Sequence, residues 1–468
     1  MQSEIAVLRF GLGARPGELQ RAAADPRAWL QEQLRGPVTL SSNLKLAPSD
    51  EILSAFLAAR AVRQLRRKAD VANNAVMEAY LPHYRAQVLA RTQSAAATTR
   101  PFGERLTHFW ANHFAVSADK GIVTGIAGTL ENEAIRPHVC GRFQDMLIAV
   151  EKHPAMIAFL DNQNSAGPNC RAAQFGGRRT GGRFGAGGDA KRGANRQLGI
   201  NENLAREIME LHTLGVQGGY TQTDVTTFAK VLSGWSIGGM RGQPGGGAPG
   251  RFFFRENLHE PGTQTLLGKT FREDGVEQGE AVLGALASHP STAQFIATKL
   301  VRHFVADEPP AALVDRVAKA FRASGGSLPD VYAALLTDDA AWETTQQKFK
   351  TPQDLVFSSL RAVDAVPSDP QEPLHSFEFL GQRQFTPGSP AGWPDNARNW
   401  DGSDALLHRV VWATRVGERF EQRSDPILIC KESLGRYARP GTMASVQRAA
   451  SASQALTLMI MSPEFQRR

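Results

Sequence analysis

The sequence predicts a mainly α-helical protein, a multi-helical globular array with at most one small β-hairpin. Three observations carry this prediction. Long stretches rich in Ala, Leu and Arg contain no glycine, Pro and Gly recur between them as helix-breaking residues, and strand-like runs are scarce. With 468 residues, of which 42% are hydrophobic and 21% charged, the chain is also able to bury a sizeable core.

The N-terminal part of the chain predicts a series of helices. The opening RFGLGARPGE is a turn, and a helix follows from about residue 18 to 34. Residues 50–97 predict two long helices, because only Pro82 interrupts an otherwise helical pattern. A further helix covers 105–117, and two or three shorter helices lie between 125 and 158, where Pro and Gly recur.

A Gly/Arg-rich insertion divides the chain. Residues 162–199 include GGRRTGGRFGAGGDAKRG, which has too few apolar side chains to pack into a core. We therefore expect a flexible segment between an N-terminal helical part, 1–161, and a C-terminal helical part, 200–468, which pack together as one large domain. The insertion also holds most of the net charge of +7, since six Arg, one Lys and one Asp between residues 171 and 199 contribute +6.

The first half of the C-terminal part predicts two helices and the main strand candidate. A helix from 202 to 214 ends at Gly215, and a second helix runs from about 223 to 235. After another Gly-rich loop, RFFFR at residues 251–255 is the clearest strand, and residues 266–269 are its candidate partner.

The remaining C-terminal sequence is again helical. Residues 277–336 show a helical pattern broken by Pro and Gly, and a shorter helix covers 355–363. The Pro and Gly of QFTPGSPAGWPDNARNW exclude long regular structure there. Two closing helices are expected at 404–420 and 444–461.

Cysteine usage and hydropathy exclude several classes of protein. Cys140, Cys170 and Cys430 lie far apart with no CxxC pair, which excludes a disulfide framework and a thiolate-rich zinc site. The amino terminus lacks the basic and apolar regions of a secretory signal, and no stretch approaches the roughly 18 apolar residues of a membrane span. We expect a cytoplasmic protein, unless an exported partner carries it to the periplasm.

The first candidate site is ERLTHFWANHF, on a predicted helix. Residues four apart share a helix face, so Glu104, His108 and Asn112 form a polar stripe, while Trp110 and His113 face an apolar side. Partial desolvation among aromatic rings favours the neutral, metal-binding form of a histidine. We therefore take His113 as a candidate metal ligand and Trp110 and Asn112 as candidate pocket residues. A core histidine held by one hydrogen bond would show the same pattern.

The second candidate site is NENLAREIMELHTLG, the densest group of polar residues in the chain. Asn203, Glu207 and Glu210 share one helix face, Arg206 lies beside it, and His212 faces the apolar side. Two carboxylates one turn apart can share a metal or divide acid and base roles. We take the first four as candidate catalytic residues and His212 as a candidate metal ligand. The same pattern also fits a solvated helix face.

A third imidazole comes from His259, in a loop after the predicted strand. With His113 and His212, and with the carboxylates of Glu207 and Glu210, it offers the nitrogen and oxygen ligands that zinc, iron and manganese use. The HExxH pattern of metalloproteases is absent. A divalent metal is expected only if these distant side chains meet in one cavity.

Two tryptophans are candidates for the wall of a substrate pocket. Trp235 follows Gly234 and Trp393 follows Gly392, so each large ring lies in a turn. Rings in these positions either wall a pocket or seal the ends of helices.

Several of these stretches also carry a family resemblance. RFGLGARPGE, HFWANHF, NENLAREIMELHTLG, YTQTDV, HEPGTQTLLGK and SPAGWPD occur in this order between Arg9 and Arg409. Together they resemble the bacterial domain-of-unknown-function family 1800. The resemblance implies that the candidate residues fall at motif positions of the family, and it adds Asp224 as a pocket candidate. It implies no activity and gives the Arg/Gly insertion no family role.

The resemblance also implies a partner. Members of this family are typically encoded beside a protein of domain-of-unknown-function family 1501, which resembles phosphatase/sulfatase-type proteins and often carries an export signal. This neighbour is the candidate partner of the chain.

Three functions from different classes remain open at this point. The first is an enzyme, or enzyme component, that uses a His/carboxylate site with or without a divalent metal. The second is a helical scaffold or partner-binding protein, whose buried polar side chains satisfy one another. The third, nucleic-acid contact through the Arg/Gly loop, is disfavoured because a nucleic-acid groove spreads its basic charge over folded surface.

Overall fold

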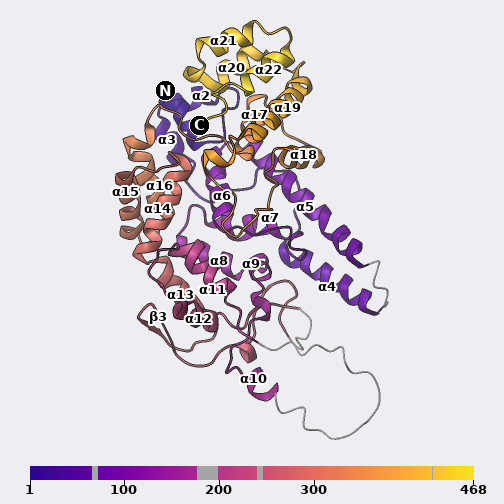
Figure 1. Ribbon diagram of the computed structural model, residues 1–468, viewed down its shortest axis with the longest axis vertical. Helices are drawn as coiled ribbons and strands as arrows, with labels where there is room; N and C mark the ends of the chain where they lie inside the picture. The colour runs from indigo at the N-terminus through magenta and orange to yellow at the C-terminus, as the bar shows by residue number, and fades with distance from the viewer. Residues whose placement is uncertain (66–71, 177–198, 240–245, 424) are drawn as a thin grey trace.

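The computed structural model describes residues 1–65, 72–176, 199–239, 246–423 and 425–468 (Figure 1). Helices dominate these ranges, and the only strands within them form two antiparallel pairs. The predicted mainly α-helical fold class is confirmed. The central part of the Gly/Arg-rich insertion, 177–198, lies outside the described residues, so its predicted flexibility stays a prediction.

The N-terminal helices largely follow the predicted pattern. The helix expected over 18–34 is divided, because the Asp25 side chain accepts a hydrogen bond from Ala28 N and caps a new helix that begins at Pro26. Pro82 lies inside a long helix. Helices α4 and α5 project together from one side of the molecule (Figure 1). The elements are α1 (Gln2–Glu4), η1 (Ile5–Phe10), α2 (Glu18–Ala23), α3 (Pro26–Glu32), α4 (Ser49–Leu65), α5 (Ala72–Ala97) and α6 (Pro101–His113).

The middle of the chain consists of short helices. Two of them depart from the prediction, because residues 130–135 form a π-helix and residues 208–213 continue α11 as another, a form often found at functional sites. The elements are α7 (Ala127–Thr129), η2 (Leu130–Ile135), η3 (Arg136–His138), α8 (Phe143–Lys152), α9 (Pro154–Phe159), η4 (Asn162–Asn164), α10 (Arg171–Gly176), α11 (Asn203–Glu207), η6 (Ile208–Thr213) and α12 (Gln222–Val231).

The strands pair differently from the prediction. The predicted strand exists as β2 (Phe252–Phe254), but its partner is β1 (Trp235–Ile237), with Ser236 opposite Phe253. The segment expected to pair with it instead forms its own hairpin, in which β3 (Gln264–Leu266) pairs with β4 (Lys269–Phe271). The tight turn between β3 and β4 explains this local pairing, since Gly268 adopts a φ of +72° there. The described residues therefore contain two antiparallel strand pairs, where at most one small hairpin was expected.

The C-terminal part contains more helices than predicted. The segment 444–461 is two helices, α21 and α22, and α18 and α20 were not predicted. Helices α19 to α22 gather at one end of the molecule (Figure 1). The elements are η7 (Glu256–Leu258), α13 (Val276–Ala287), α14 (Pro290–Phe304), α15 (Ala311–Ala323), α16 (Leu328–Thr337), η8 (Asp339–Trp342), α17 (Pro352–Ala362), α18 (Gln371–Phe379), η9 (Ala397–Asn399), α19 (Ser403–Phe420), α20 (Pro426–Leu434), η10 (Gly435–Tyr437), α21 (Pro440–Gln447) and α22 (Ala452–Ile460).

One large hydrophobic core connects the two ends of the chain. It extends from Ile5 to Phe465 and includes the inner side chains of α6, α14 and α17. The central helix α6 is buried along most of its length, which places its polar residues inside the protein. Within the described ranges, every helix is too short or too polar to cross a lipid bilayer.

Candidate functional site

A pocket of about 70 Å³ lies beside α6. Its walls come from α5, α6, η2, α14, α17 and the loop 382–395, so segments far apart in the sequence meet there. Apolar walls combined with a few convergent polar groups are typical of ligand sites. The polar residues that line the pocket are Arg91, His108, Asn112, Glu131, His303, Thr351, Gln353, Asp354, Gln382 and Asp395.

His303 on α14 and Asp395 in the loop form a hydrogen-bonded pair at one wall of this pocket. The distance from His303 Nδ1 to Asp395 Oδ2 is 2.8 Å. Because an ionised carboxylate only accepts hydrogen bonds, Nδ1 carries the ring proton and Nε2 is the basic atom. Nε2 is buried and has no hydrogen-bond partner among the described residues. The pair thus leaves one oriented, basic nitrogen unused.

The environment keeps the two groups in defined charge states. Burial lowers the pKa of His303 to about 4, although Asp395 opposes the shift. Burial alone would raise the pKa of Asp395, but His303 and Lys348 outweigh it and bring that pKa to about 2. At neutral pH the pair is therefore a neutral imidazole beside a carboxylate, as in a general base with its orienting partner.

The loop that carries Asp395 is attached directly to α6. The Asn112 side chain accepts a hydrogen bond from Trp393 N at 2.7 Å and donates one to Trp393 O at 2.9 Å. Gly392 makes this contact possible, because it has a φ of +85° and a Cβ there would lie 2.3 Å from the Asn112 carbonyl oxygen. The predicted pocket residues Asn112 and Trp393 therefore both line the pocket and hold its wall in place.

A buried lysine holds the same loop from the other side. Lys348 Nζ lies 2.5 Å from Asp307 Oδ1 and 2.5 Å from the Asp395 carbonyl oxygen. It also lies 3.4 Å from the Asp395 carboxylate oxygen Oδ1. The indole nitrogen of Trp400 donates to the Pro394 carbonyl oxygen at 2.9 Å. Backbone and side chain of Asp395 are therefore both fixed.

Asp354 lies next to this pair and is held by two buried arginines. Its Oδ1 accepts hydrogen bonds from Nη1 and Nη2 of Arg105 at 3.1 and 2.9 Å, and its Oδ2 accepts one from Arg468 Nε at 3.0 Å. Burial favours a raised pKa for Asp354, but Arg105 and Arg468 outweigh it and hold the pKa well below its usual range. The Asp354 carboxylate is thus already neutralised by its partners.

A second group of buried charges includes Arg91 and Glu131 of the pocket lining. Glu104 accepts hydrogen bonds from both terminal nitrogens of Arg136, which also reaches Glu131. Arg91 Nε lies 3.0 Å from Glu131 Oε2. His108 lies 3.4 Å from Glu104, yet neither ring nitrogen makes a hydrogen bond to a described residue. Burial lowers the pKa of His108, so a second neutral imidazole lines the pocket.

The predicted metal ligands His113 and His212 lie close together but outside the pocket lining. Their ring centroids are 6.2 Å apart, and His113 Nε2 lies 3.1 Å from the His212 carbonyl oxygen. His212 Nδ1 lies 2.8 Å from Glu151 Oε1, and both partners are buried. Burial lowers the pKa of His113 well below its usual value.

The third predicted ligand, His259, has different neighbours. Its Nδ1 lies 3.0 Å from the Ser233 carbonyl oxygen, and its ring packs against Phe254. Within the described ranges, no three His, Cys, Asp or Glu side chains lie close enough to hold a metal ion. The predicted ligands His113, His212 and His259 therefore do not form one metal site within these ranges. A bound divalent metal stays a prediction.

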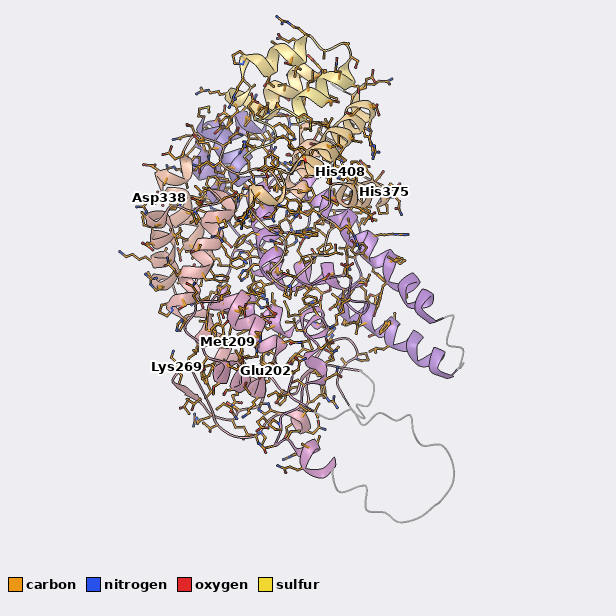
Figure 2. The ribbon with its side chains drawn as sticks, in the orientation of Figure 1. Glu202, Met209, Lys269, Asp338, His375 and His408 are labelled. Carbon is orange, nitrogen blue, oxygen red and sulfur yellow. The ribbon has the colours of Figure 1, made fainter. Side chains whose placement is uncertain are left out.

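The predicted catalytic residues of α11 and η6 also lie outside the pocket lining. Arg206 donates a hydrogen bond to Glu202 on the preceding turn, and partial burial raises the pKa of Glu207. Figure 2 shows Glu202 and Met209, from this segment, in the lower part of the molecule. A catalytic role for Asn203, Arg206, Glu207 and Glu210 stays a prediction.

The other three predicted pocket residues have structural contacts. Trp110 is buried and donates its indole N–H to the Tyr332 hydroxyl at 2.7 Å. Asp224 forms the capping box of α12 with Thr221. Trp235 is buried in β1. None of the three is among the described residues that line the pocket.

Sequence reasoning missed His303, Asp395 and Asp354. His303 lies in an ordinary amphipathic helix, and 92 residues separate it from Asp395, so no local spacing connects them. The only signal was the Pro/Gly-rich motif SPAGWPD, which ends at Asp395 and whose rigid turns are suited to fixing a side chain.

Comparison with known proteins agrees with this architecture only at the level of family. A family model described as a protein of unknown function, DUF1800, matches residues 5–467, nearly the whole chain. No curated protein and no solved structure matches the chain.

Proposed function

The chain belongs to the DUF1800 family, and we propose that it is an enzyme in which His303, oriented by Asp395, acts as a general base. The observation that carries the proposal is the His303–Asp395 hydrogen bond beside a pocket, with a buried Nε2 that no described residue contacts by a hydrogen bond. A buried polar atom without a partner costs about 1–3 kcal/mol. A ligand group that donates to Nε2 would recover this cost.

The proposed chemistry is a proton transfer. Nε2 of His303 takes a proton from a bound water or a substrate O–H or N–H group, and the ring becomes an imidazolium. The Asp395 carboxylate, which already accepts the Nδ1 proton, stabilises that charge, and the imidazolium then returns its new proton to the leaving group or product. Because Nε2 is covered in the free chain, this chemistry requires a side chain of the pocket wall to move when the substrate enters.

The other pocket residues support this role in different ways. His108 is a second imidazole in the pocket lining, and its Nδ1, which has no hydrogen-bond partner in the described part of the chain, is the atom that would donate to or accept from the substrate. Phe114, Val116 and Leu130 line the apolar wall, which excludes water and strengthens the electrostatic contacts.

The test is a comparison of matched histidine variants on a panel of chromogenic ester, amide, phosphate-ester and sulfate-ester substrates. We expect His303→Gln to reduce any activity of the wild-type chain by about 10²-fold or more, the usual contribution of a general base. His408→Gln is the control, because His408 (Figure 2) is half-exposed on α19, where it lies 4.0 Å from Asp404. Equal activity of the His303 variant and the control would refute the proposal.

A second candidate function is a scaffold that binds a partner protein. It is favoured by the network of Glu104, Arg136, Glu131 and Arg91, in which buried charges pair with one another across four elements. Under this alternative, a member of the 1501 family copurifies with the chain, and His303→Gln leaves the complex and all measured activities unchanged.

A further inference from the structure

Arg468 contacts the proposed base His303, although 165 residues separate the two in the sequence. Its guanidinium is buried, with a side-chain exposure of 1%. The backbone of Arg468 pairs with Lys348 in both directions, since each residue's N–H donates to the other's carbonyl oxygen, at 3.3 and 2.9 Å. This pairing holds the arginine beside the pocket wall.

The Arg468 guanidinium bridges three parts of that wall. Nη1 donates a hydrogen bond to the His303 carbonyl oxygen at 2.7 Å, and Nε donates one to Asp354 Oδ2 at 3.0 Å. Nη2 lies 3.8 Å from Asp395 Oδ1 and makes no hydrogen bond to a described residue. One planar group thus connects α14, α17 and the loop that carries Asp395.

We propose that Arg468 is a positioning residue that holds His303, Asp354 and Asp395 in register. This inference rests on the proposed function, because it assigns a role to Arg468 through the base His303. Arg468 itself contacts the backbone of His303 and no reacting atom.

The charges around His303 determine whether loss of Arg468 raises or lowers the pKa of His303. Asp395 faces it from the loop and favours the protonated ring, as does Asp354 on α17 at longer range. Arg468 and Arg105 oppose a second positive charge and lower the pKa of His303, in addition to the larger effect of burial.

Two lysines act on His303 indirectly. Lys348 lies against Asp395, and Lys299, one turn before His303 on α14, also interacts with that carboxylate. Neither lysine replaces the cation that Arg468 supplies next to His303. Removal of Arg468 therefore leaves Asp395 and Asp354 less compensated and raises the pKa of His303.

Arg409 provides a matched control for burial and charge. Its side chain is buried like that of Arg468, but its hydrogen bonds go to Gln466 Oε1 and to the Lys350 carbonyl oxygen, at 2.7 Å each. It makes no hydrogen bond to His303, Asp354 or Asp395 in the described chain. If the loss of any buried arginine shifted the His303 titration, substitution of Arg409 would shift it as much as substitution of Arg468.

The experiment is a pH titration of the His303 ring by NMR in the full chain, labelled with ¹³C at histidine Cε1 and assigned by the signal that His303→Gln removes. Arg468→Met should move the His303 titration upward by about one pH unit or more, as expected for loss of a nearby cation. Arg468→Lys, which keeps the charge without the planar fork, should give less than half of that shift. Arg409→Met should leave the titration at the wild-type position.

The outcomes separate this inference from the proposed function. An unchanged titration in Arg468→Met, or an equal shift in Arg409→Met, overturns the positioning role. If Arg468→Met does not fold, Arg468→Lys provides the test. A His303 pKa that rises in Arg468→Lys to the value expected for an unfolded chain contradicts the proposal. A shifted titration together with full activity of His303→Gln would keep the role of Arg468 but refute the general base.

Discussion

At the scale of single residues, the pocket is built from charges that are almost all paired. The sequence spacing correctly indicates that Glu104, His108 and Asn112 share one face of α6, because this relation depends only on helix geometry. It does not reveal which partner each charge finds. Arg136 reaches Glu104 from another helix, and that contact follows from packing and not from local pattern.

The pairing of Glu104 gives the first residue-scale prediction. Glu104→Gln leaves Arg136 buried with one fewer negative partner, so we expect a loss of about 3–5 kcal/mol in the free energy of unfolding. Glu32→Gln breaks an exposed pair with Arg35 and should change this quantity by less than about 0.5 kcal/mol. Urea unfolding of both variants makes the comparison, and equal losses would show that the Glu104 pair is not buried as described.

At the scale of elements, the loop 386–400 matters most, because it brings Asp395 to α14. Its composition predicted irregular structure, which the protein has, and Trp393 is among the described residues that line the pocket. The helices were predicted well where Pro and Gly mark their ends, as at α13 to α16. The π-helix η6 and the pairing of β2 with β1 were missed, because both depend on neighbours distant in sequence.

The attachment of this loop to α6 gives a prediction about two glycines with the same backbone conformation. Gly392 and Gly381 have φ values of +85° and +82°, but only at Gly392 would a Cβ meet other atoms, at 2.3 Å from Asn112 O. Gly381→Ala should therefore cost only the backbone strain of about 1–2 kcal/mol. Gly392→Ala adds a steric clash and should lower the free energy of unfolding by clearly more, in the same urea experiment. Equal costs would contradict the close contact of loop and helix.

At the scale of the whole molecule, one core that extends from Ile5 to Phe465 brings distant segments to the pocket. The sequence predicts the class of fold because helical periodicity is a local property. It does not predict that α14 and the SPAGWPD loop meet, since that depends on how all the helices pack. For this reason the predicted metal ligands His113, His212 and His259 are not among the described residues of the pocket lining, whereas the predicted Asn112 and Trp393 are.

The buried histidines predict how the stability of the whole molecule depends on pH. Burial lowers the pKa values of His108, His113 and His303 below the value of about 6.5 expected in the unfolded chain. Between pH 6.5 and about 4 the unfolded chain binds more protons than the folded one, so stability falls as pH falls through this range. The urea midpoint should be lower at pH 5 than at pH 7.5, and His303→Gln should reduce the difference. A midpoint that is constant or rises toward pH 5 would contradict these burial effects.

The protonation state of His303 is measured most directly by the ¹⁵N NMR spectrum of its ring in the ligand-free, full chain between pH 5 and 8. We predict a neutral ring throughout this range, with the proton on Nδ1 and an unprotonated Nε2, because Asp395 accepts the Nδ1 proton and burial lowers the pKa of His303 to about 4. A ring that becomes charged near pH 6.5, or that carries its proton on Nε2, would contradict it.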